Sequence, residues 1–598
     1  MGSRGHARHA LAATVAGLLA VTATPAAAAP GVDARASAWA RDVLRGMNLE
    51  QKVGQLFVAD VWGKSADEVN AGNQTKYGVN TAAQVVEKYH PGGVIFFNNS
   101  GTDNVDDPAQ VARLSNGLQR AALGSGAHLP LIVSIDQEGG RVTRIGAPAS
   151  EYPASMAIGA GRGDGDAKRL ATINGHELRA MGITQNFAPD ADVNSNPLNP
   201  IIGSRSFSAD PALASRLVVA EVDGYQNSGP ATKTVSSAVK HFPGHGDAAT
   251  DSHTGLPVIS RTVQQWREID LPPFQAAIDA GIDVIMTAHI TVPSLDPSGE
   301  PATLSKPIMT GILRNELHYN GVVVTDSLQM AGVRQMHSDA EIPVLALEAG
   351  VDQMLMPPDL GIAIKGVLDA VSSGRLTEQH IDQSVLRILE LKVKRGILAR
   401  PLVDERTVTR EVGTSRHLEG IQAITDRTTT VLRNDAGLLP LRNPGGILVT
   451  GWNNPSYPGY PAEPVNTLAA QLGGMAMPTG AGPTAAKIGT VTAAAKDAGT
   501  VIVLANGLRT SPPQRDLVNA LLATGKPVIA VSVQEPYDPG YADVPTWVAT
   551  YDWRDVTMKS LARVLLGKIS PRGRLPVAIP AGDDTTRTLF PFGAGLSW

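Results

Sequence analysis

The chain has 598 residues, of which 43% are hydrophobic and 18% are charged, and its formal net charge is −5. A single hydrophobic core stops growing at roughly 250 to 300 residues, so this length predicts two large domains. The mild acidity and the lack of Lys/Arg clusters argue against nucleic acid as a partner.

The first 29 residues have the layout of a secretory signal peptide. Basic residues precede an apolar run at 10–23, and small residues follow Pro25. The run is shorter than the ~20 residues that span a bilayer, so a membrane anchor is the weaker interpretation. The lack of cysteine excludes disulfides and a lipid-modified cysteine at the cleavage site. We expect a secreted protein whose mature chain begins near Ala29 or Pro30 and has no integral membrane segment.

Eight short apolar runs recur before residue 360, and stretches with helical periodicity separate them. The runs cover residues 53–60, 93–98, 131–136, 183–192, 238–243, 283–289, 321–326 and 351–357. Continuous apolarity is typical of parallel strands that are buried on both faces, with the helical stretches as crossovers. Eight such units over about 350 residues predict a (β/α)8 TIM-type barrel.

Barrels of this kind carry their chemistry at the C-terminal ends of the strands and on the loops that follow. The polar residues at these ends are therefore candidate functional residues. They are Asp60, Asp136, Asp192, Lys240, His241, His289 and Asp326. We expect some of them to be structural, and the Asp190 to Asp192 segment is interpreted first as a strand end that bonds local backbone.

A second domain of a different kind is predicted after the barrel. The amphipathic stretch 377–398 is expected to be the last barrel helix, and the polar segment 404–416 belongs to a linker. Five further apolar runs alternate with helical spacers and predict an α/β/α sandwich. These runs cover residues 430–433, 446–451, 500–505, 528–533 and 547–551. The predicted division is a signal peptide at 1–29, a barrel at 30–400, a linker at 401–429 and a sandwich at 430–598.

Segment 240–253, with the sequence KHFPGHGDAATDSH, concentrates polar chemistry in one loop. Pro243 and the glycines exclude a helix here. His241 and His245 have the spacing of a zinc pair, but that motif requires a helix, and the chain has no cysteine to complete a site. We therefore expect no metal and no cofactor.

The end of this loop pairs Asp251 with His253, a spacing at which a carboxylate can orient an imidazole for proton transfer. A surface turn with an incidental ion pair is the simpler alternative. Asp326 ends the seventh run, and both loops open on the same face of the barrel. A carboxylate opposite a proton donor is the arrangement of retaining glycoside hydrolysis, here with an imidazole where a second carboxylic acid is usual.

The chain resembles the β-N-acetylglucosaminidase branch of glycoside hydrolase family 3. That branch carries Lys-His-(Phe/Ile)-Pro-Gly-His-Gly followed by Asp-Ser-His, which matches 240–253, and Asp-Gln-Glu-Gly-Gly-Arg-Val, which matches 136–142. The runs 567–577 and 590–593 resemble the second domain of the family. The resemblance extends over the whole mature chain.

The resemblance implies roles for individual residues. Asp326 is the implied nucleophile, and His253, held by Asp251, is the implied general acid/base. The implied sugar-binding residues are Asp136, Arg144, Arg205, Lys240 and His241. Charged groups suit this task because they form short, strong hydrogen bonds to hydroxyls. For Arg144, a surface ion pair is an equal alternative.

These observations predict an exported, monomeric, exo-acting and retaining β-N-acetylglucosaminidase that acts on an oligosaccharide or muropeptide. Peptidoglycan fragments and chitin oligosaccharides both stay open as substrates. A β-glucosidase or β-xylosidase with Glu535 of the second domain as acid/base is one alternative, and transfer of the sugar to phosphate is another. A secreted carbohydrate-binding protein without activity is the third, although the nucleophile and the acid/base are both present.

Overall fold

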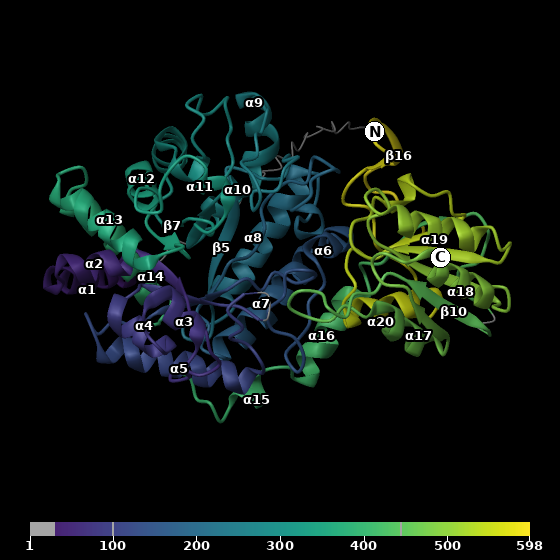
Figure 1. The fold of residues 1–598 in the computed structure, drawn as a ribbon, viewed down its shortest axis with the longest axis horizontal. Coiled ribbons are helices and arrows are strands. Elements are labelled where there is room, and N and C mark those ends of the chain that lie inside the picture. Colours follow the sequence, from purple (N-terminus) through teal and green to yellow (C-terminus); the bar gives the residue numbers. More distant parts are fainter. Residues whose placement is uncertain (1–29, 99–100, 443–444) are drawn as a thin grey trace, which may run out of the picture.

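The computed structural model describes residues 30–98, 101–442 and 445–598. They form two domains, drawn in purple to teal and in green to yellow in Figure 1. The predicted signal peptide lies outside the described residues. Within these ranges, no helix combines the length and the apolarity that crossing a bilayer requires.

Eight parallel strands form the first domain, one in each of the predicted apolar runs. They are β1 Phe57–Asp60, β2 Gly93–Phe96, β3 Ile132–Ile135, β4 Gln185–Asn186, β5 Ser236–Phe242, β6 Val284–Thr287, β7 Val322–Val324 and β8 Met354–Leu355. Strands that are consecutive from β1 to β7 pair in parallel, β8 pairs with β1, and a bridge between Val324 and Gln353 joins β7 to the segment before β8. The predicted barrel is confirmed, although residues 53–55 belong to helix α2 (Leu49–Gln55) and not to the first strand.

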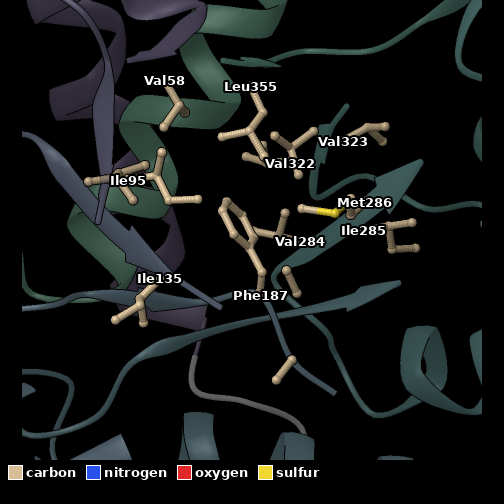
Figure 2. Close-up of a cluster of buried hydrophobic side chains, with 14 of the residues drawn as sticks. Val58, Ile95, Ile135, Phe187, Val284, Ile285, Met286, Val322, Val323 and Leu355 are labelled. Atoms are coloured by element: carbon tan, nitrogen blue, oxygen red, sulfur yellow. The ribbon is translucent and has the colours of Figure 1, made fainter. Parts of the chain in front are cut away.

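Apolar side chains fill the interior of the barrel. Figure 2 shows the ring of Phe187 among Ile95, Val284, Val322 and Leu355, all of which are at most 3% exposed. The interior is thus a packed core and not a pore, which restricts ligand binding to the ends of the strands.

Helices surround the barrel. The longer ones are α1 Pro30–Gly46, α4 Ala82–Tyr89, α5 Pro108–Gly124, α7 Asp164–Ala180, α8 Pro211–Asn227, α10 Leu271–Asp279, α12 Ile342–Ala349, α13 Leu360–Ser372 and α14 Glu378–Lys394, with a π-helix at Pro307–Glu316. The predicted last barrel helix is α14. It begins where the Thr377 side chain accepts a hydrogen bond from the N–H of His380, a polar cap that satisfies a donor at the helix start.

The second domain is built on a six-stranded sheet with the order β11-β10-β12-β13-β14-β9. Its strands are β9 Thr430–Asn434, β10 Ile447–Gly451, β11 Met475–Pro478, β12 Thr500–Ala505, β13 Val528–Ser532 and β14 Thr546–Ala549, and only β9 is antiparallel to its neighbour. Its main helices are α17 Pro464–Leu472, α18 Ala485–Ala495, α19 Pro512–Leu522 and α20 Asp555–Leu565.

Both faces of this sheet are covered. Val503 of β12 belongs to one buried cluster, whereas its neighbours Ile502 and Leu504 belong to another, as expected for a strand whose side chains alternate between two faces. The predicted sandwich is confirmed. The edge strand β11 and the terminal hairpin β15 Ile579–Ala581 with β16 Asp584–Phe590 were not predicted.

Packing contacts join the two domains in addition to the connecting segment of the chain. The segment predicted as a linker contains helices α15 Val408–Glu411 and α16 Ser415–Thr425, and Figure 1 shows α16 between the domains. A stronger connection is the short helix α6 (Ser155–Gly161) of the barrel domain. Its residues Met156, Ala157 and Ala160 are buried in the same cluster as Val503 and Leu517 of the sandwich.

We expect Met156→Ala to lower the free energy of unfolding by about 2–5 kcal/mol, because it leaves a cavity in the core that the domains share. Denaturant unfolding followed by circular dichroism measures the change. Met475→Ala on β11 is the control, since its side chain is 57% exposed and its loss is expected to cost less than about 0.5 kcal/mol. Equal effects of the two substitutions would contradict a shared core.

Candidate active site

An open cleft of about 570 Å³ lies at the C-terminal end of the barrel strands. Seven of the eight predicted site residues line it, and the eighth, Asp251, lies directly behind His253. The seven are Asp136, Arg144, Arg205, Lys240, His241, His253 and Asp326. They come from β5 and from the loops after β3, β4, β5 and β7, which meet on one face because the strands are parallel.

Asp326 follows strand β7 and lines the cleft, where its side chain is half-buried. The N–H of Ser327 donates to its Oδ1 at 2.7 Å. Burial opposes ionisation, but His241, His289 and this hydrogen bond outweigh it and hold the pKa of Asp326 below its ordinary value. Asp326 is therefore a carboxylate at neutral pH and can act as a nucleophile.

His253 and Asp251 form a hydrogen-bonded dyad on the loop after β5. Nδ1 of His253 lies 2.8 Å from Oδ1 of Asp251, and the backbone N–H of His253 donates to the same oxygen at 2.9 Å. Partial burial of Asp251 opposes ionisation, but these two hydrogen bonds hold its pKa below the ordinary value. With Nδ1 bonded to a carboxylate, Nε2 is the ring nitrogen left for proton exchange with a ligand.

Ser252, which lies between Asp251 and His253, attaches the dyad loop to two neighbouring segments. The Ser252 hydroxyl lies 3.0 Å from Nε2 of His245, and its carbonyl accepts a hydrogen bond from the N–H of Gly332 at 3.1 Å. A Cβ at Gly332 would lie 2.9 to 3.1 Å from the carbonyl oxygens of Gly255, Ser252 and His289. Only glycine at position 332 therefore allows the segment that follows Asp326 to approach the dyad loop this closely.

A cluster of four charges, two of them buried and two partly buried, occupies the wall of the cleft beside Asp326. Nζ of Lys240 lies 2.7 Å from Asp136 and 2.6 Å from Glu138. Arg205 forms two hydrogen bonds with Glu138, at 2.9 and 2.8 Å. Burial alone would neutralise Glu138, but Arg205 and Lys240 hold its pKa far below the ordinary value. Two cations and two anions thus hold each other in fixed positions, as donors and acceptors for a polyhydroxylated ligand.

His241 is oriented from behind by the Asp190 to Asp192 segment. Its Nδ1 lies 2.7 Å from Asp192, while a guanidinium nitrogen of Arg205 lies 3.4 Å from its Nε2. Burial lowers the pKa of His241 to about 4, so the ring is neutral near pH 7. Asp192 also accepts a hydrogen bond from the N–H of His245, so the local backbone role expected for this segment coexists with one in the site.

Asp190, Asp192 and His241 bring their ligand atoms within 4.8 Å of one another. Arg205 lies 3.7 Å from Asp190 and already supplies a positive charge to this group. Burial and the neighbouring Asp192 raise the pKa of Asp190, so a cation bound there would have to compete with a proton for this carboxyl group. We therefore interpret the group as support for His241.

Arg144 lies in the cleft and not on an open surface. Its guanidinium lies 5.0 Å from the centre of the Phe97 ring and 3.9 Å from Asp136. Arg144 thus combines an ion pair with a place in the cleft, and its role in sugar binding stays a prediction. Two other strand-end candidates are outside the cleft: Asp60 pairs with Lys76 at 2.5 Å, and His289 contacts the carbonyl oxygen of Ser327 at 3.0 Å.

The cleft residues that were not predicted include three with ionisable side chains: Glu138, Arg141 and Tyr457. Glu138 and Arg141 lie inside the quoted 136–142 motif, so their proximity to Asp136 was the available signal. Tyr457 comes from the second domain, and nothing in the local sequence indicates it. Glu535, the alternative acid/base, is not one of the described residues that line the cleft. Its carboxylate lies 3.7 Å from the guanidinium group of Arg141.

Two family models match the chain. The Glycosyl hydrolase family 3 N terminal domain matches residues 48–391, and the Glycosyl hydrolase family 3 C-terminal domain matches residues 429–598. The chain belongs to glycoside hydrolase family 3. The barrel with the candidate nucleophile and the sandwich that covers one side of it are thus the two domains of this family.

Relatives in glycoside hydrolase family 3 include Beta-hexosaminidase A of Pseudoalteromonas piscicida, which is 39% identical over 389 residues. That match covers 60% of this chain and 62% of the relative, so it spans less than two thirds of either protein. A solved β-N-acetylglucosaminidase from Paenibacillus sp. str. FPU-7 is similar over 90% of this chain and 99% of that one, with a TM-score of 0.81 and 35% identity. A Cellulomonas fimi protein named beta-N-acetylglucosaminidase/beta-glucosidase is 27% identical over 68% of each chain.

We expect Glu138→Gln to lower the free energy of unfolding at pH 7 by about 3–5 kcal/mol, because it leaves Lys240 and Arg205 with an uncompensated buried charge. The folded state holds the pKa of Glu138 below its ordinary value of 4.5, so its stabilising effect is complete above pH 4.5 and is lost as the pH falls below that value. The difference between wild type and variant, measured by urea unfolding, is therefore expected to narrow below pH 4.5.

The control for this variant is Glu268→Gln, which alters an exposed carboxylate that accepts a hydrogen bond from the side chain of Gln264 at 2.9 Å. We expect its effect to stay within about 0.5 kcal/mol at every pH. If the difference in free energy of unfolding between wild type and Glu138→Gln grew as the pH fell, that result would contradict the ionised state assigned to Glu138.

Proposed function

We propose that the protein is an exo-acting, retaining β-N-acetylglucosaminidase that removes terminal β-linked N-acetylglucosamine. The observation that carries the proposal is the pairing, in one cleft, of a half-buried, ionised carboxylate, Asp326, with an imidazole that a second carboxylate orients. The similarity to the Paenibacillus β-N-acetylglucosaminidase and to the Pseudoalteromonas β-hexosaminidase supports the choice of sugar.

In the first step, Asp326 attacks the anomeric carbon while His253 donates its Nε2 proton to the glycosidic oxygen. The bond to the leaving group breaks, and a glycosyl ester to Asp326 forms. In the second step, His253 takes a proton from water as the water oxygen attacks the same carbon and releases Asp326. Two inversions at one carbon retain its configuration. Asp251 stabilises the positively charged ring at the stage when His253 carries both protons.

The charged cluster orients the sugar for these steps. We propose that Asp136, Lys240, Arg144, Arg205 and His241 bond the ring hydroxyls and the acetamido group. Because the members of the cluster hold one another in position before a ligand arrives, they lose little freedom on binding.

We further propose export through the signal peptide at 1–29, function as a monomer, and peptidoglycan fragments or chitin oligosaccharides as substrates. Comparing kcat/KM on purified muropeptides and on chitobiose distinguishes the two substrates. A neutral imidazole as acid/base does not repel phosphate, so products are best assayed in phosphate buffer. Free N-acetylglucosamine supports hydrolysis, whereas a sugar 1-phosphate contradicts it.

Replacement of Asp326 by Ala removes the proposed nucleophile. We expect kcat on a nitrophenyl N-acetyl-β-glucosaminide to fall by a factor on the order of 10³ or more, with little change in the unfolding midpoint. The control is Asp223→Ala, which removes a partly exposed carboxylate on α8 that pairs with Lys168. More than a tenth of wild-type turnover in Asp326→Ala would exclude the nucleophile assignment.

Replacement of His253 by Ala tests the general acid, because the effect of a general acid depends on the leaving group. Nitrophenolate departs without protonation, so we expect kcat/KM for the nitrophenyl glycoside to change little. For chitobiose, whose leaving group is a sugar alkoxide, we expect a loss of about 10²-fold or more. Equal losses on the two substrates would indicate that His253 only positions the ligand.

A further inference from the structure

One part of the cleft wall belongs to the second domain. The ring of Tyr457 lines the cavity together with Arg141 and Arg144 of the barrel domain. Tyr457 lies on the loop that follows β10, and a two-way backbone bridge between Asn454 and Ala462 closes the base of this loop.

The loop is held from both domains. On its own side, the Tyr457 ring packs against Trp553 with ring centres 4.8 Å apart, and Trp553 packs against Trp452 at 5.0 Å. On the barrel side, the Tyr460 hydroxyl accepts a hydrogen bond from the N–H of Gly146 at 2.5 Å. Tyr457 therefore has a fixed position in the cleft, which a sugar-binding surface requires.

The exposure of the surrounding side chains identifies the closed end of the cleft. His253, which must reach the oxygen of the leaving group, has a side chain that is 57% exposed. Arg141 and Arg144, beside Tyr457, have side chains that are only 15% and 18% exposed. These exposures favour a leaving group at the open end beside His253 and a terminal sugar that extends from Asp326 toward Arg141 and Arg144.

We propose that Tyr457 is the end wall of the sugar pocket. Its ring contacts the terminal sugar on the side away from the cleaved bond, and its bulk excludes any further unit attached there. In a β-linked pyranose, the ring position opposite the anomeric carbon is C4, so C4 and its hydroxyl face Tyr457. This inference rests on the proposed function and adds to it a cause for exo action that lies in the second domain.

The test compares Tyr457→Ala with wild type on a nitrophenyl N-acetyl-β-glucosaminide and on chitobiose. Because the contact is to the terminal sugar and not to the leaving group, we expect KM to rise by about tenfold on both substrates alike. Tyr457→Phe keeps the ring and is expected to stay within about twofold of wild type. Tyr541→Ala is the matched control, since it truncates a partly exposed tyrosine of the same domain that bonds Asp583 and does not line the cleft.

A second substrate tests the wall itself. Wild type is expected to reject the 4-O-methyl derivative of the nitrophenyl glycoside, and Tyr457→Ala is expected to reduce that discrimination by tenfold or more. Unchanged discrimination, or a loss confined to chitobiose, would overturn the end-wall assignment.

Wild-type activity on three nitrophenyl glycosides, the N-acetyl-β-glucosaminide, the β-glucoside and the β-xyloside, separates this inference from the proposed function. If wild type cleaves the nitrophenyl β-glucoside or β-xyloside but not the N-acetylglucosaminide, the proposed sugar is wrong. The Tyr457 comparison is then made on the glycoside that is cleaved, because the contact does not involve the acetamido group. If wild type cleaves none of the three, the cleft is not a glycoside site and both proposals are overturned.

Discussion

The charge balance around Lys240 is the constraint on which the rest of the site depends. Lys240 is almost completely buried, and the free energy of removing an ammonium group from water must be offset by nearby anions. Asp136 from the end of β3 and Glu138 two residues later supply that charge, and Arg205 from the loop after β4 balances the second anion. The ends of three neighbouring strands are thereby held in register along one wall of the cleft.

The two halves of the proposed chemistry have opposite environments. Asp326 is half-buried and is kept ionised by its neighbours, so its reactivity does not require movement of the chain. His253 is largely exposed and is held by one carboxylate and by the attachment of Ser252. A nucleophile attacks one defined atom, whereas a proton donor must serve leaving groups of different shapes. A fixed position for Asp326 and an exposed position for His253 suit these two tasks.

The sequence predicted what depends on local patterns. Most of the barrel strands are apolar because they are buried on both faces, and the 240–253 segment carries its chemistry in neighbouring residues. Strand β11 was missed because its four residues, Met475–Pro478, form a short run that ends in proline, and Met475 and Ala476 are exposed at the edge of the sheet. Glu138 was missed because its partners Lys240 and Arg205 come from distant parts of the chain. Tyr457 was missed for a similar reason, since it reaches the cleft only when the two domains pack together.

Helix α6 limits how this protein can be divided or recombined. Its apolar face is part of the core of the sandwich, and nearby the buried Arg554 of the sandwich donates to the carbonyl of Gly140 at 2.7 Å. A barrel produced alone would expose Met156, Ala157 and Ala160 to water and lose that cap on the 136–142 turn. A chimera that exchanges second domains therefore has to exchange α6 with them, and a free-standing barrel needs polar residues at these three positions.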